Sequence, residues 1–126
     1  MDHVNEISQK CCKHPSFALS IDEMMKLFKG RSNMTFRMKK KPIKEGFKFF
    51  AMCDSHNGFV YYFLPSGLNE KKKRTIAETV VKMAKRLPGR RKKQYIITMD
   101  NYFTSRPTMK GLQKKGVAGL GTARAK

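Results

Sequence analysis

The chain has 126 residues, 40% of them hydrophobic, which is enough for one domain or part of one. Its 28 Lys and Arg against nine Asp and Glu give a formal net charge of +19, which favours nucleic acid as the partner over a basic surface that is only solvated. Three cysteines, an odd number, argue against a disulfide framework, and no apolar stretch reaches membrane-spanning length. We therefore expect a nuclear protein with no membrane and no small-molecule substrate among its partners.

The N-terminal stretch is predicted to be a short amphipathic helix over residues 2–13. Val4, Ile7 and Cys11 recur at helical spacing there, and Pro15 ends the pattern. The cysteines at 11 and 12 are adjacent, and the sequence has no second ligand pair, so this spacing disfavours a zinc site. Residues 1–16 are therefore predicted to be an N-terminal helical or flexible segment.

Residues 17–28 allow two interpretations. Ser20 with Glu23 three residues later would form a capping box at the start of a helix, which would also account for the acidic pair Asp22-Glu23. The same stretch is equally compatible with an extended segment that leads to a turn at Gly30.

A β-hairpin is predicted over residues 47–64. The run FKFFAMCD, residues 47–54, is apolar and rich in aromatic residues, and FVYYFLP follows after a short polar turn. Asn57-Gly58 in that turn is a strong hairpin signal. Pro65 and Gly67 end the second strand.

The next element is predicted to be a helix that begins after Thr75. Thr75 and Glu78 form a capping box, and Pro88-Gly89 ends the helix. One face of this helix is apolar and should pack inward; its members are Ile76, Val80, Met83, Ala84 and Leu87.

A strand, a helix and the start of another strand are predicted to follow. YIITM, residues 95–99, is the strand, and Asp100 comes directly after it. Thr104 or Ser105 caps the helix, which has Pro107 in its first turn and Gly116 at its end. Residues 117–126 then begin the next strand.

Two aspartates stand at the ends of predicted strands. A helix separates the strands 47–54 and 95–99, an order that favours a parallel pair with a crossover. Asp54 and Asp100 would then lie close together at the carboxyl ends of the strands, where α/β proteins bind ligands and where Mg²⁺ could bridge them. The alternative, that each aspartate only starts a turn, stays open.

Three runs of basic residues are candidates for DNA contacts, and they also resemble nuclear-localisation patches. They comprise Lys39, Lys40 and Lys41; Lys71, Lys72, Lys73 and Arg74; and Arg90, Arg91, Lys92 and Lys93.

Several blocks of the sequence together resemble the catalytic core of piggyBac-type transposases. They are SIDEMMKLFKGR, KKPIKEGFKFFAMCDSHNGFVYYF, MDNYFTS and LQKKGVAGLGTAR, in that order over residues 17–124. The resemblance implies an RNase H-like fold in which a triad of aspartates holds two Mg²⁺ ions, with Asp54 and Asp100 at two of the three positions. It also implies cut-and-paste DNA transposition with a preference for TTAA targets.

Residues 17–126 are accordingly predicted to be an incomplete RNase H-like domain. We expect an α/β fold whose mixed sheet contains a hairpin and a β-α-β crossover. Self-association into a homo-oligomer stays an open alternative.

No acidic residue follows Asp100 in the sequence, so a third carboxylate is missing. We therefore expect a catalytically incomplete transposase-derived chain. Two alternatives remain: a partner chain supplies the third carboxylate, or the chain is a non-enzymatic basic module that binds DNA or another partner and in which the aspartates have no role.

Overall fold

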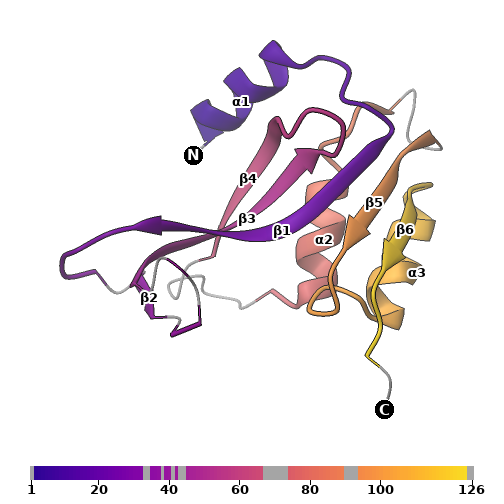
Figure 1. Ribbon diagram of the computed structural model, residues 1–126. Helices are drawn as coiled ribbons and strands as arrows, with labels where there is room; N and C mark the ends of the chain where they lie inside the picture. The colour runs from indigo at the N-terminus through magenta and orange to yellow at the C-terminus, as the bar shows by residue number, and fades with distance from the viewer. Residues whose placement is uncertain are drawn as a thin grey trace.

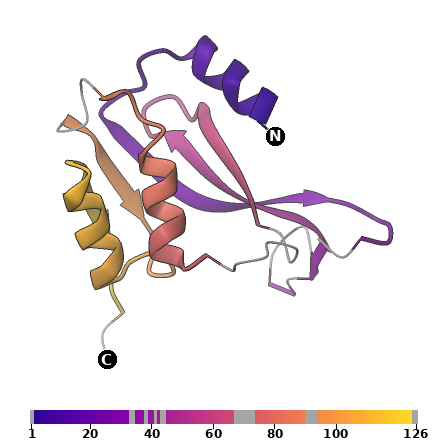
Figure 2. The ribbon, with the colours of Figure 1, turned by 180° about the vertical axis from the view of Figure 1, so that it is seen from behind.

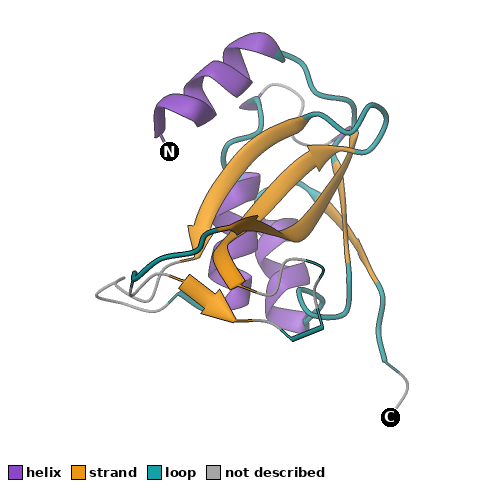
Figure 3. Cartoon of the chain, turned by 60° about the vertical axis from the view of Figure 1, so that its left-hand side comes forward, coloured by secondary structure: helices purple, strands orange, loops and turns teal. Residues whose placement is uncertain are grey.

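The computed structural model describes residues 2–32, 35–37, 39–40, 42, 45–66, 74–89 and 94–124. A six-stranded mixed sheet carries two helices on one face, with a third helix near one end (Figures 1 and 3). In chain order the elements are α1 (Asp2–Cys11), β1 (Ala18–Leu27), β2 (Thr35–Arg37), β3 (Glu45–Asp54), β4 (Val60–Ser66), α2 (Ile76–Ala84), β5 (Ile96–Met99), α3 (Arg106–Lys114) and β6 (Ala118–Gly121).

One half of the sheet is antiparallel. β3 pairs with β1 from Gly46 to Asp54, and the predicted hairpin is confirmed as the pair β3 and β4. Gly58 takes a positive φ of 73° in the turn, as the Asn-Gly signal predicts, and the backbone N–H of Phe59 donates to Oδ1 of Asn57. β2 pairs with the first residues of β3, beyond the part that β4 covers.

The other half of the sheet is parallel. β1 pairs with β5, and β5 pairs with β6, so β5, α3 and β6 form a β-α-β crossover. It joins other strands than the crossover predicted from the sequence. Gly116, with φ 72°, ends α3 and lets the chain turn back into β6.

Helices α2 and α3 cover one face of the sheet, and in Figure 2 they lie in front of it. Both begin as the sequence predicts: Thr75 and Glu78 form the capping box of α2, and Ser105 caps α3. Leu19, Ile97, Val80 and Leu112 have no exposed surface where these helices meet β1 and β5. The core lies between the two helices and the sheet, and it extends into the antiparallel half through Met52 of β3 and Tyr61 of β4.

Helix α1 forms where it is predicted, but its apolar residues do not form its buried face. Val4 and Ile7 are 45% and 46% exposed, and the buried residue is Asn5. Its amide nitrogen donates to the carbonyl of Phe63 at 2.8 Å, and its Oδ1 accepts from the Phe63 N–H at 2.7 Å. The Asn5 side chain thus bonds the backbone of β4 as a neighbouring strand would. It satisfies the N–H and the carbonyl of Phe63 on this edge strand.

The ambiguous segment 17–28 forms strand β1, so Ser20 and Glu23 do not form a capping box. β1 lies between β3 and β5, and its insertion makes the predicted parallel pairing of residues 47–54 with 95–99 wrong. β3 runs antiparallel to β1, and β5 runs parallel to β1. β3 and β5 therefore run in opposite directions, so Asp54 lies beside the start of β1 and Asp100 lies beside the residue after Ile21.

Candidate functional site

Asp22 and Asp100 lie level with each other on adjacent parallel strands. The last paired residues of β1 and β5 are Ile21 and Met99, and each aspartate is the next residue in its chain. Adjacent strands lie about 4.8 Å apart, so the backbones that carry the two carboxylates are close neighbours. β5 ends at Met99, whereas β1 continues beyond Asp22 to Leu27, so the pair lies at the carboxyl end of β5 and beside the middle of β1. The carboxyl ends of parallel strands are where α/β sheets place ligand sites.

The two aspartates belong to the face of the sheet that α2 and α3 leave open. Side chains two residues apart on a strand point to the same face, so Asp22 shares a face with Ser20. Asp100 comes two residues after Thr98 and is assigned to the face of Thr98 in the same way. The Ser20 and Thr98 hydroxyls lie 2.9 Å apart across the two strands, which shows that this face is continuous from β1 to β5. Ile21 and Met99 point to the opposite face and are buried.

Both carboxylates are exposed and retain acceptor capacity. Oδ1 of Asp22 accepts from the Glu23 N–H at 2.7 Å, and Oδ1 of Asp100 accepts from the Tyr102 N–H at 3.0 Å. These two bonds hold the side chains near the backbone. Within the described ranges no further hydrogen bond engages either Oδ2, so one oxygen of each residue is available to a ligand.

Asp54 lies elsewhere. It pairs with Leu19 of β1, which lies three residues, or about 10 Å, along that strand from Asp22. Strand β1 also lies between Asp54 and Asp100. The exposed fraction of Asp54 is 3%. The predicted pairing of Asp54 with Asp100 in one site therefore does not fit this geometry.

The Asp54 carboxylate is instead bound within the protein. Its Oδ2 accepts from the Ser16 N–H at 2.7 Å, and its Oδ1 accepts from the Ser16 hydroxyl at 2.6 Å and the His56 N–H at 2.9 Å. Burial acts to raise the pKa of Asp54, but these hydrogen bonds and one from the Asn57 N–H hold that pKa below its usual value. The carboxylate joins the segment before β1 to the hairpin turn.

A buried ion pair connects β1, β3 and the turn after Asp100. Lys48 Nζ lies 2.8 Å from Oε1 of Glu23, and both side chains are about nine-tenths buried. The same ammonium lies 5.1 Å from the ring centre of Phe50 and 5.2 Å from that of Tyr102. Because Glu23 follows Asp22 and Tyr102 follows Asp100 by two residues, Lys48 contacts both segments that carry the paired carboxylates.

The predicted basic runs fall mostly outside the described residues. Lys39 and Lys40 are exposed in a turn, and Arg74 is half-buried just before the cap of α2. Lys41, Lys71, Lys72, Lys73, Arg90, Arg91, Lys92 and Lys93 lie outside the residues that the structure describes. The DNA-binding role of these runs stays a prediction.

Sequence reasoning missed Asp22 because the capping interpretation accounted for it. The available signal was the alternation of apolar Leu19 and Ile21 with polar Ser20 and Asp22, which is typical of a half-buried strand. With 17–28 assigned as a strand, Asp22 would have become a candidate beside Asp100.

A protein-family model described as Transposase IS4 matches residues 1–126. The chain belongs to this family. A search of curated proteins found no match. Among solved structures, a piggyBac transposase synaptic complex with hairpin DNA matches 94% of this chain with a TM-score of 0.73 and 28% identity. A pre-cleavage Mos1 transpososome matches 96% with a TM-score of 0.46 and 16% identity.

This member of the Transposase IS4 family has the mixed α/β sheet of RNase H-like transposase catalytic domains, which confirms the predicted fold class. It spans 26% of the length of the solved piggyBac transposase chain and 41% of the Mos1 chain. None of its described helices is long and apolar enough to cross a membrane.

Proposed function

We propose that this chain carries part of the catalytic site of a DNA transposase, with Asp22 and Asp100 as the carboxylates that hold a divalent cation. One observation carries the proposal: these exposed aspartates lie level with each other where the parallel pairing of β1 with β5 ends. The piggyBac structure it resembles was determined as a complex with hairpin DNA, which makes DNA the proposed partner.

The donor set suits Mg²⁺. Carboxylate oxygens are hard ligands, and Mg²⁺ is usually held by one or two carboxylates, with water and substrate phosphate oxygens in the remaining positions. When bound, such an ion polarises a phosphoryl oxygen and lowers the pKa of a bound water. The role of the protein is to place the two carboxylates, and Lys48 restrains both segments that carry them.

Metal binding in the presence of DNA tests this proposal. Mn²⁺ binding is followed by electron paramagnetic resonance with a short DNA duplex present. We expect wild type to bind Mn²⁺, and we expect Asp22→Asn and Asp100→Asn each to bind it at least tenfold more weakly. Glu45→Gln, which removes an exposed carboxylate from β3, is the matched control and should bind as wild type does. Unchanged binding in both site variants would exclude the site.

Asp54→Asn separates the two assignments of the second carboxylate. If Asp22 is the partner of Asp100, Asp54→Asn keeps Mn²⁺ affinity under conditions in which circular dichroism shows the variant folded. Loss of binding in folded Asp54→Asn, with Asp22→Asn unaffected, would favour the assignment made from the sequence.

A second candidate function is a basic DNA-binding module without catalysis. It is favoured by one observation: 28 Lys and Arg against nine Asp and Glu give the chain a formal net charge of +19. Divalent-dependent nicking of supercoiled plasmid distinguishes the two. Nicking that disappears in Asp100→Asn supports the transposase site, and DNA binding without nicking, unchanged by Mg²⁺, supports the module.

A further inference from the structure

Helix α3 presents a row of three cations to solvent. Arg106, Lys110 and Lys114 are spaced four residues apart and are all exposed. Thr108 and Leu112 are fully buried, which fixes how the helix is rotated on the sheet. At 3.6 residues per turn the row is centred on the side opposite these two residues, so it points directly away from the core.

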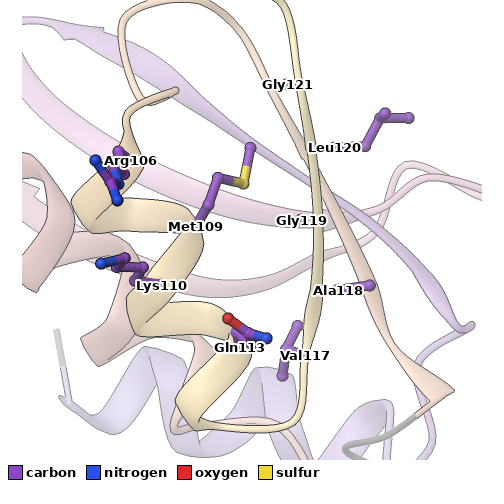
Figure 4. Close-up of a pocket in the computed structure, with 9 residues that line it drawn as sticks. All are labelled: Arg106, Met109, Lys110, Gln113, Val117, Ala118, Gly119, Leu120 and Gly121. Carbon is purple, nitrogen blue, oxygen red and sulfur yellow. The ribbon is translucent and has the colours of Figure 1, made fainter.

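The row lines a hollow in the surface. A concave region of ≈ 580 Å³ is bordered by Arg106, Pro107, Lys110, Gly111 and Lys114. A neighbouring hollow of ≈ 560 Å³, between α3 and β6, shares Arg106 and Lys110, and Figure 4 shows these two side chains one turn apart along the helix. At Gly111 a Cβ would meet Val81 of α2 at 2.5 Å, so the missing side chain lets α2 and α3 pack closely beside this hollow.

Among the described residues, no carboxylate forms an ion pair with this row. α3 contains no acidic residue, and no acidic residue occurs after Asp100 in the sequence. In the part of the chain that the structure describes, the three cations take part in no ion pair. Arg106 stands in the first turn, where the helix dipole disfavours a positive charge, and Lys114 stands in the last turn, where the dipole favours one, so the two effects on the helix oppose each other.

The dimensions of the row match a nucleic-acid backbone. From Arg106 to Lys114 the helix advances about 12 Å, at 1.5 Å per residue. One strand of duplex DNA carries a phosphate about every 3.4 Å along its axis, so three to four phosphates fall within that length. An elongated row of unpaired cations beside a hollow fits a polyanion better than it fits a single small anion.

We propose that the Arg106, Lys110 and Lys114 row of α3 binds the sugar-phosphate backbone of duplex DNA, a surface separate from the basic runs predicted from the sequence. The inference rests on the proposed function, because it takes DNA as the partner. Contacts to phosphates position the protein on the duplex without reading its sequence, so the row should contribute equally to binding of any duplex.

The salt dependence of binding tests the row. The variant Arg106→Gln/Lys110→Gln/Lys114→Gln and wild type are titrated with a fluorescent duplex of about 20 base pairs, from about 50 to about 200 mM salt. Loss of three phosphate contacts should make the slope of log K against log salt less steep by about 2.7, at about 0.9 per phosphate. Over that fourfold range of salt, wild type should then lose about 40-fold more affinity than the variant does.

The matched control removes the same charge elsewhere. Lys10, Lys13 and Lys26 are exposed residues outside α3, and their triple Gln variant should keep the wild-type slope. A further variant, Arg106→Lys/Lys110→Arg/Lys114→Arg, keeps the charges and should also keep the slope. If the α3 triple variant and the control triple variant flatten the salt slope equally, the effect comes from net charge in general and the inference is overturned.

The remaining outcomes separate this inference from the function on which it rests. If wild type shows no salt-dependent affinity for duplex DNA, the proposed DNA partner is wrong and the inference falls with it. If wild type binds and the α3 triple keeps its slope, only the α3 surface is overturned. If polyglutamate or single-stranded RNA binds as tightly as the duplex, with the same change of slope, the assignment to duplex DNA is overturned.

Discussion

Asp54 is buried and bound by several hydrogen bonds, whereas Asp22 and Asp100 are exposed, so the three carboxylates contribute differently to the molecule. The Asp54 carboxylate stabilises the fold through Ser16 and His56. The other two are available to a ligand. Substitution of each should therefore separate stability from metal binding.

We expect Asp54→Asn to lower the free energy of unfolding by about 1–3 kcal/mol at neutral pH, because one amide oxygen cannot accept all the buried donors. The folded-state pKa of Asp54 is lowered, so its stabilisation is present above the usual aspartate value and is lost as pH falls through the lowered one. Urea unfolding of wild type from about pH 6 to about pH 2 should show this loss. Asp54→Asn should show a flatter acid limb, and an equally steep limb would contradict the assigned hydrogen bonds.

Lys48→Met should destabilise the fold by about 3–5 kcal/mol, because it leaves the carboxylate of Glu23 buried and unpaired. The double variant Lys48→Met/Glu23→Gln should recover much of that loss, since it removes the uncompensated charge. Equilibrium denaturation of both single variants and the double variant measures the coupling. Additive effects of the two substitutions would show that the pair is not coupled.

At the scale of elements, the edge strand β4 depends on α1. Asn5 makes two hydrogen bonds to the backbone of Phe63, and both would be lost in Asn5→Ala. We expect a cost of about 1–3 kcal/mol and faster hydrogen exchange at the Phe63 amide, because that backbone group would lose its protein partner. Val4→Ala, an exposed site on the same helix, is the control and should leave the exchange rate unchanged.

At the scale of the whole molecule, the net charge of +19 opposes compactness through self-repulsion. Salt screens this repulsion, with a Debye length of about 10 Å at 0.1 M. We therefore expect the melting temperature to rise by several degrees between about 20 and about 300 mM sodium chloride. A melting temperature that is constant or falls with salt would show that the charges are spread too widely to repel one another appreciably.

Much of the local structure could be predicted because its signals are short-range. The Thr75 and Ser105 caps, the Asn57-Gly58 turn and the end of α3 at Gly116 each depend on a few adjacent residues, and all are confirmed. The inward face of α2 was also predicted correctly, because burial follows the helical period. The face of α1 was not, since the backbone of β4 needed a polar partner and Asn5 supplied it.

The sequence by itself determined the excess of positive charge, the order of the later elements from residue 47 on, and the resemblance to piggyBac-type transposases. Only the tertiary structure decided that residues 18–27 form a strand between β3 and β5, and so that Asp22 rather than Asp54 lies beside Asp100. The physical reason is that strand order and register depend on pairing between residues far apart in the chain. Local alternation and turn signals specify a strand without specifying its neighbour.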